Sequence, residues 1–212
     1  MSFLKPRSSE TTRDRLMTVA ELAILEKGFA ATSIEELIAE VGITKSGFFY
    51  HFKDKSELVK AILERHLEAE EMWFDGLFAR ARELDDDPLH EFLIFLRLLR
   101  EDMERLPDVH PGCLIAACCF QERLFEREVH RLAKDSLLKW RNRFHARFQV
   151  IAKLYPPRVD VDLAALADML TCVVDGAIIL SKTVREKEVL PRETELYRQF
   201  VKTVFLGTEH PA

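Results

Sequence analysis

The stretch that most constrains the fold is residues 32–58, TSIEELIAEVGITKSGFFYHFKDKSEL. Ser33 and Glu36 have the spacing of a capping box, which satisfies two backbone donors at the start of a helix. Apolar residues then recur at helical spacing as far as Val41, and Gly42 can adopt the left-handed conformation that ends a helix. The pattern predicts a short helix that buries one face and stops at a tight turn.

A second short helix follows the turn. Thr44 can cap it, its first residues are polar, and the predicted apolar anchors are Phe48, Phe49 and Phe52. Asp54 and Glu57 form another capping box, which opens a longer helix. This order of elements predicts a helix-turn-helix over residues 33–52, a motif whose second helix enters the DNA major groove.

The sequence around this motif closely resembles the DNA-binding domain of the TetR family of transcriptional regulators over residues 10–70. The family more often has a small or aliphatic residue and then Leu at the positions of Phe48 and Phe49, but both residues here are still apolar. The matching segments are Arg15-Leu16, Ala20, Glu26–Phe29, Ala31–Ser33, Ile38-Ala39, Val41–Gly47, Tyr50–Phe52 and Lys55–Leu58.

The resemblance implies an all-α protein with an N-terminal three-helix domain and a C-terminal helical bundle, residues 71–212, for ligand binding and dimerisation. The helical patterns predict about nine helices. Beyond the motif, helices are expected over residues 11–27, 55–82, 113–120 and 122–154, from Pro88 with Asp87 as cap, from an Asp162 cap to about 186, and from Pro191 to just before Gly207.

The chain has 212 residues and a net charge of −5, which is unexpected for a protein that binds DNA. Residues 1–60 contain nine Lys or Arg and nine Asp or Glu, so all the net negative charge lies in the remainder. This balance favours dimer-dependent affinity over a broad basic surface. No apolar run approaches the ~20 residues that span a bilayer, and the N-terminus lacks the apolar core of a signal peptide. We therefore expect a cytoplasmic protein with no membrane partner.

The residues expected to face DNA lie on and around the second helix of the motif. Tyr50 can donate its hydroxyl to a phosphate, and Lys45 is suited to a base edge, most simply guanine. Gly47 permits a close backbone approach. The resemblance implies that Lys55 binds phosphate, although it is also a plausible exposed salt-bridge partner. The predicted DNA-binding residues are Ser33, Thr44, Lys45, Ser46, Gly47, Tyr50, His51 and Lys55.

Large apolar side chains are numerous in the C-terminal domain, and for most of them core packing is the simplest interpretation. The resemblance implies a small-molecule pocket in this domain, and aromatic and thioether groups suit an apolar ligand. We expect a hydrophobic or aromatic ligand in a cavity of a few hundred Å³. The predicted lining is Phe92, Phe95, Leu96, Leu99, Met103, Cys118, Trp140, Phe144, Phe148 and Val174.

The last two helices carry apolar stripes that packing within the chain or a dimer interface could absorb. The resemblance favours a four-helix homodimer interface, and a near-palindromic operator in double-stranded DNA requires two reading helices. The predicted interface residues are Leu163, Leu166, Ala167, Leu170, Val174, Ile178, Leu196, Phe200 and Val204.

No catalytic grouping, cofactor motif or metal-ligand spacing is recognisable, so no enzyme activity is expected. The four cysteines are interpreted as buried thiols, with redox sensing by Cys118 and Cys119 as a weaker alternative. The leading hypothesis is a DNA-binding regulator, most simply a repressor released by an apolar ligand. The alternative is a helical ligand carrier or enzyme with a vestigial helix-turn-helix.

Overall fold

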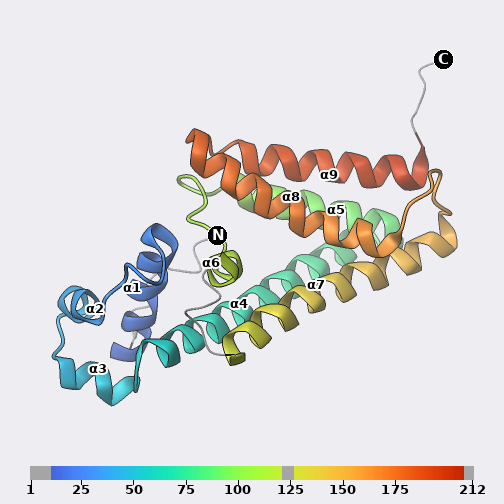
Figure 1. The fold of residues 1–212 in the computed structure, drawn as a ribbon. Coiled ribbons are helices and arrows are strands. Elements are labelled where there is room, and N and C mark those ends of the chain that lie inside the picture. The colour runs from blue at the N-terminus through green and yellow to red at the C-terminus, as the bar shows by residue number, and fades with distance from the viewer. Residues whose placement is uncertain (1–10, 121–126, 208–212) are drawn as a thin grey trace. The chain divides into compact units, whose positions relative to one another are not determined.

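The computed structural model describes residues 11–120 and 127–207. Within these residues the chain is all helical and contains no strand, which confirms the predicted fold class (Figure 1). The nine helices are α1 (Thr12–Lys27), α2 (Ile34–Val41), α3 (Lys45–His51), α4 (Lys55–Leu84), α5 (Pro88–Glu104), α6 (Leu114–Phe120), α7 (Arg127–Leu154), α8 (Leu163–Val184) and α9 (Val189–Leu206).

The helices group into two compact units. Of the described residues, the N-terminal unit contains 11–70, 111–120 and 127–136, and the C-terminal unit contains 71–110 and 137–207. Within the N-terminal unit, α6 packs against α1, and Lys60 of α4 forms an ion pair with Glu128 of α7 at 2.8 Å. The consecutive domains 10–70 and 71–212 stay a prediction.

The helix ends in the N-terminal unit follow local signals. Gly42 is left-handed with φ 73° and ends α2 as predicted. The Ser33 hydroxyl accepts the backbone N–H of Glu36 at 3.2 Å. The second half of this capping box is not formed, because the Glu36 carboxylate pairs with Lys27. A complete capping box occurs at the start of α1, where the sequence analysis had not predicted one.

The core of the N-terminal unit lies beneath the helix-turn-helix. Phe48 and Phe52 are buried as predicted, whereas Phe49 is 46% exposed and is not an anchor. One carboxylate is also buried there. Glu21 of α1 accepts a hydrogen bond from Arg65 at 2.8 Å and lies 3.2 Å from Nδ1 of His66. These polar contacts fix α1 against α4.

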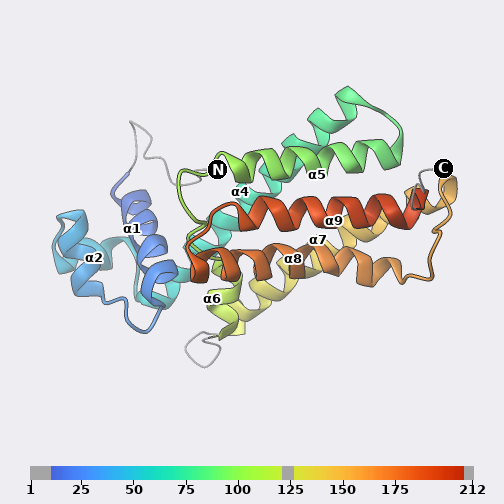
Figure 2. The same ribbon diagram turned by 90° about the horizontal axis from the view of Figure 1, so that it is seen from above.

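The C-terminal unit is built around an aromatic cluster. Phe78 of α4 stacks on Phe95 of α5 with ring centroids 4.0 Å apart, and Phe92 lies 4.8 Å from Phe148 of α7. Helix α9 packs against both α5 and α8, and Figure 2 shows α9 with these two helices along its sides. This core consists of side chains from all five helices of the unit.

Most predicted helix boundaries in the C-terminal unit agree with the structure. Asp87 caps α5 and Pro88 lies in its first turn, which confirms both assignments. The last helix begins at Val189, so Pro191 lies inside its first turn and does not open it. The predicted start of the seventh helix at residue 122 lies outside the described residues.

Helix α8 is more apolar than the sequence analysis anticipated. Its 22 residues are long and apolar enough to cross a membrane by length and composition, and only 28% of its most apolar stretch is buried. The prediction that no such segment exists was therefore wrong. Helix α8 therefore has a second apolar face that the other described residues of the chain leave uncovered.

Candidate nucleic-acid interface

Helix α3 exposes a polar face and buries the opposite, apolar face. Phe48 is 0% exposed and Phe52, which ends the helix, is 1% exposed. On the opposite side Tyr50 is 85% exposed, and the neighbouring Phe49 contributes an exposed ring. The two buried rings hold the helix in place, so they also fix the positions from which the exposed side chains project.

The first turn of α3 is organised by hydroxyl groups. The Thr44 hydroxyl accepts the backbone N–H of Gly47 at 3.2 Å, which confirms Thr44 as the cap. It also shares a 2.9 Å hydrogen bond with the hydroxyl of Ser46. Both hydroxyls are therefore held on the exposed side of the turn, beside Lys45.

An ion pair that the sequence analysis did not predict joins α2 to α3. Nζ of Lys45 lies 3.3 Å from Oε1 of Glu35, and the two side chains are 64% and 68% exposed. A hydrogen bond from its own backbone N–H and the contact with Lys45 hold the pKa of the Glu35 carboxyl below its usual range. Helical periodicity within either helix does not reveal this contact, because it depends on how the turn folds α3 against α2.

Gly47 lies on the same turn. The packing around it within the chain would also accept a residue with a side chain. A Cβ added there would meet the Thr44 hydroxyl at 3.5 Å and Ile43 at 3.6 Å, which are ordinary van der Waals separations. If Gly47 is needed, the need must come from a neighbour outside the chain. That is compatible with the predicted close approach to DNA.

Two further predicted contacts are placed at the margins of this surface. The Ser33 hydroxyl is used as the cap of α2 and remains on an exposed residue. His51 is half-buried at the end of α3, with its ring centroid 5.0 Å from that of Tyr50. His51 therefore lies beside the exposed face of α3, Ser33 lies at the start of α2, and neither residue is in the core.

Lys55 has a different environment from the one expected. Its ammonium group donates to the backbone carbonyls of Phe29 at 2.5 Å and Thr32 at 2.6 Å, and lies 3.9 Å from the centre of the Phe29 ring. Burial holds the pKa of Lys55 below its usual range. The geometry assigns Lys55 to fastening the connection between α1 and α2, because its ammonium group donates to two backbone carbonyls within that connection.

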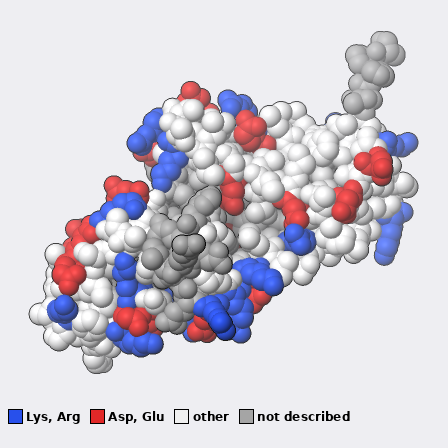
Figure 3. All heavy atoms as spheres, in the orientation of Figure 1, with Lys and Arg blue, Asp and Glu red and all other residues white. Residues whose placement is uncertain are grey.

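Charges of both signs are interspersed around the helix-turn-helix. Figure 3 shows Lys and Arg beside Asp and Glu over the N-terminal unit, with no continuous basic patch on the face displayed. This agrees with the even charge balance of residues 1–60. Attraction to DNA must then come from a few placed side chains.

The main residues predicted to line an apolar cavity are buried in the core. Phe95, Leu96, Phe144 and Phe148 have no exposed surface, so no water-sized space adjoins them. The rings instead pack against one another, as expected of a close-packed core. Met103, Trp140 and Val174 keep some exposure, and Cys118 belongs to the N-terminal unit.

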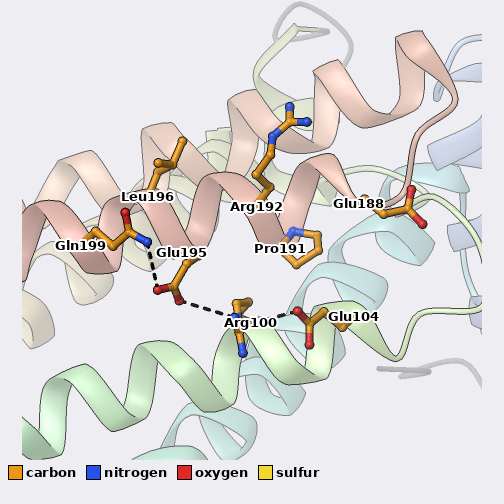
Figure 4. A pocket seen from close by; sticks show the side chains of 8 residues that line it. All are labelled: Arg100, Glu104, Glu188, Pro191, Arg192, Glu195, Leu196 and Gln199. Carbon is orange, nitrogen blue, oxygen red and sulfur yellow. Dashed lines mark hydrogen bonds and ion pairs between the residues drawn. The ribbon is translucent and has the colours of Figure 1, made fainter.

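A groove does occur between α5 and α9, but its chemistry is charged (Figure 4). Its volume is about 330 Å³. Arg100 lies at its centre, with its guanidinium 3.6 Å from Glu104 and 3.7 Å from Glu195. Two arginines and three glutamates line it, so it does not match the apolar pocket predicted from sequence. Its lining is Arg100, Glu104, Glu188, Pro191, Arg192, Glu195, Leu196 and Gln199.

The predicted dimer residues fall on two different faces. Leu166, Ala167, Leu170 and Val204 are buried within the chain, and Ile178 is nearly so, because this stripe packs into the core of the C-terminal unit. Leu163 and Val174 are partly buried against the same core. Only Leu196 and Phe200 of the predicted set are exposed. The exposed face of α8 was missed, and it contains Ala165, Met169, Cys172, Gly176, Ile179 and Leu180.

The cysteines differ from one another in exposure. Cys118 is buried, and burial together with Cys119 raises the pKa of its thiol to about 12, which makes it unreactive. Cys119 and Cys172 are exposed, so the expectation of four buried thiols was wrong for these two. No disulfide joins any of the four, and no metal-binding cluster of His, Cys, Asp and Glu occurs in residues 11–120 and 127–207.

Comparison with known proteins places the helix-turn-helix in a family. Residues 16–62 match the family described as bacterial regulatory proteins, tetR family. An uncharacterized HTH-type transcriptional regulator of Lactococcus lactis from the lacX 3' region is 22% identical over 191 residues, 88% of this chain and 91% of that protein. The HTH-type transcriptional regulator TtgR of Pseudomonas putida is 32% identical over 83 residues, 38% of this chain and 37% of that protein.

Solved structures extend the likeness to the whole fold. A TetR-family transcriptional regulator from Agrobacterium tumefaciens superposes with a TM-score of 0.74 at 17% identity, covering 92% of this chain and 97% of that one. The strongest sequence likeness therefore lies in α1–α4, and the helical arrangement is shared beyond it. The helix-turn-helix of residues 16–62 thus matches the tetR family of bacterial regulatory proteins, and the all-helical fold of the described chain is like that of solved TetR-family regulators.

Proposed function

We propose that this protein binds a near-palindromic DNA operator as a homodimer, with one α3 helix in the major groove of each half-site. The observation that carries the proposal is the exposed polar face of α3, where Lys45, Ser46 and Tyr50 project above two buried phenylalanines. Phosphate contacts from hydroxyl groups position such a helix, and contacts from Lys45 to a base edge give it specificity.

Fluorescence anisotropy tests the DNA contact, with a duplex selected by the protein from a random pool. Tyr50→Ala should weaken binding to all duplexes to a similar degree, because it removes a phosphate contact. Lys45→Ala should also relax base preference at one position by ~1–3 kcal/mol. Lys139→Ala, which removes an exposed lysine of α7, is the matched control. Unchanged binding by the Tyr50 and Lys45 double variant would contradict the assignment of α3.

The exposed apolar face of α8 supports the homodimer. Ile179 is 56% exposed and Leu180 is 44% exposed, and Leu196 and Phe200 of α9 add an adjoining apolar surface. Figure 3 shows mostly uncharged side chains over α8. We assign the face to a second copy of the chain and not to a membrane, because α8 also carries the charged side chains Asp168, Asp175 and Lys182. Its Asp168 carboxylate accepts two hydrogen bonds from Arg141 at 2.7 Å.

Gly176 offers a clean test of that interface. A Cβ added at Gly176 meets nothing within 4 Å, and the same holds for Gly76 of α4. Both sites therefore have open space for the first carbon of a side chain, and we expect arginine to be tolerated at each within a single chain. Sedimentation velocity should show that Gly176→Arg dissociates the dimer while Gly76→Arg leaves it intact. Two intact dimers would place the interface elsewhere.

We further propose that the protein represses transcription and that a hydrophobic ligand releases it from DNA. Phe95, Phe144 and Phe148 are fully buried, so a ligand that contacts them must favour a second conformation with an opened core. A ligand identified by thermal shift should lower operator affinity by roughly 1–3 kcal/mol, and operator should lower ligand affinity by the same factor. A stabilising ligand that leaves operator affinity unchanged would contradict this mechanism.

A further inference from the structure

We propose that Glu35 and Lys45 form one recognition unit that reads both bases of a single G·C pair in each half-site. The inference rests on the proposed function, since it assumes that α3 enters the major groove. It adds Glu35 of α2 as a specificity-determining residue. This residue lies outside the set predicted from the sequence.

The geometry places an acceptor beside a donor on the surface that faces DNA. Glu35 is the second residue of α2 and Lys45 is the first residue of α3, so the turn between the helices fixes both ends of the pair. Their charged atoms are 3.3 Å apart, and both side chains are more than half exposed. The carboxylate of Glu35 therefore lies beside any base edge that the ammonium group of Lys45 contacts.

The pair matches a G·C edge atom for atom. In the major groove guanine presents the acceptors O6 and N7, and cytosine presents the N4 amino donor. An ammonium group only donates and a carboxylate only accepts. O6 and N4 of a base pair are joined by a hydrogen bond of about 2.9 Å, close to the separation of the two side-chain atoms. Lys45 can therefore donate to guanine while Glu35 accepts from cytosine.

The same arrangement disfavours a pair with adenine in place of guanine. Adenine places its N6 amino donor where guanine has O6, and thymine places its O4 acceptor where cytosine has N4. The ammonium would then meet a donor and the carboxylate an acceptor. A pair with thymine in place of guanine presents O4 and N6 in the matching order, so Lys45 must also use the N7 acceptor of guanine to reject it. Discrimination against the wrong base therefore comes from unfavourable contacts as well as from the loss of favourable ones.

Electrostatics point to specificity and not to general affinity. The pair is neutral as a whole, so it adds little attraction to phosphates. An exposed ion pair also contributes little to folding stability. The DNA phosphates repel the carboxylate of Glu35 unless the amino group of a base donates a hydrogen bond to it. DNA sites that lack this amino group therefore bind the protein more weakly.

Glu36, the next residue of α2, provides a matched control. Its carboxylate pairs with Lys27 of α1 and not with α3. Glu35→Gln and Glu36→Gln are the same chemical change on neighbouring residues of one helix, and both side chains are exposed. Each replaces a carboxylate with an amide of similar shape, so circular dichroism and thermal unfolding should show intact folds for both variants.

The experiment is selection of duplexes from a random pool by the wild type and the two variants, followed by anisotropy titrations of single-base substitutions. The wild type should require G·C at one position of each half-site. Glu35→Gln should reduce the preference for guanine over adenine at the position that Lys45 contacts by roughly 5- to 100-fold, the range of one good side-chain contact with a base. It should also tighten binding to unrelated duplexes, because Lys45 is released. Glu36→Gln should keep the wild-type preference.

An unchanged base preference at every position in Glu35→Gln would overturn the inference while leaving the proposed function in place. A loss of preference of equal size in Glu36→Gln would also overturn it, because the effect would then be one of general charge. Enrichment of no sequence by the wild type would overturn the proposed function itself.

Discussion

Helices α3 and α8 both bury one face, but their exposed faces differ in chemistry. On α3 the buried Phe48 supports an exposed surface that carries Lys45 and Tyr50. On α8 the buried Leu170 lies opposite an exposed surface that carries Ile179. The first surface is suited to charged and polar DNA, and the second is suited to another apolar surface. What a helix binds is thus decided by the face that the fold leaves uncovered.

The sharpest test of this comparison uses the two faces of α8. Leu170→Ala should lower the free energy of unfolding by about 2–5 kcal/mol, because it leaves a cavity in the core. Ile179→Ala should change the stability of the single chain by less than about 0.5 kcal/mol and should weaken the dimer instead. Urea unfolding and sedimentation, both over a range of protein concentrations, separate the two effects. The comparison breaks if Ile179→Ala destabilises the single chain as much as Leu170→Ala does.

A second test asks whether Lys55 belongs to the DNA surface around α3 or to the support beneath it. Lys55→Ala removes two hydrogen bonds from a charged donor to backbone carbonyls, and should cost about 1.5–3 kcal/mol of stability. The neighbouring exposed Lys53 serves as control, and Lys53→Ala should cost less than about 0.5 kcal/mol. If Lys55→Ala leaves thermal and urea unfolding unchanged and weakens DNA binding, the phosphate contact implied by family resemblance is correct.

The third and smallest effect concerns pH and the buried contacts that Glu21 of α1 makes with Arg65 and His66 of α4. Burial alone would lower the pKa of His66. The hydrogen bond with Glu21, the charge of Glu70 and the charge of Glu21 together outweigh burial and the opposing charge of Arg65, so the pKa of His66 is raised. A raised folded-state pKa stabilises the protein fully below the unfolded-state value of 6.5. That contribution is lost as pH rises through the folded-state pKa.

Urea unfolding of the wild type and of His66→Gln, measured at a series of pH values from slightly acid to slightly alkaline, checks this sign. The wild type should lose stability as pH rises across that window, and the variant should lose less. A wild type that gains stability over the same pH window would show that protonated His66 does not strengthen the contact with Glu21.

The helix-turn-helix could be predicted because its signals are local. The cap at Thr44 and the left-handed residue at Gly42 act on atoms within a few residues, so the short sequence contains the information. Glu35 was missed because its contact with Lys45 crosses the turn between two helices. Phe49 was misplaced because an apolar residue in a short helix does not reveal which side faces inward.

The C-terminal unit was harder to predict for a related reason. Apolar residues surround much of α8, and the sequence alone does not show which stripe faces α9. The chain buries the stripe that contains Leu166 and Leu170, and leaves the stripe that contains Ile179 exposed. The aromatic side chains expected to line a cavity pack against one another, as Phe78 and Phe95 do. Composition predicts an apolar interior, but it does not predict where that interior contains space.

The central claim is that two copies, joined through α8 and α9, bring two α3 helices to one operator. Sedimentation equilibrium of the protein on its selected duplex tests this claim most directly. The account predicts two chains per near-palindromic duplex, and no comparable complex for Gly176→Arg at the same concentration. A stable complex of one chain per duplex, formed equally by Gly176→Arg, would contradict it.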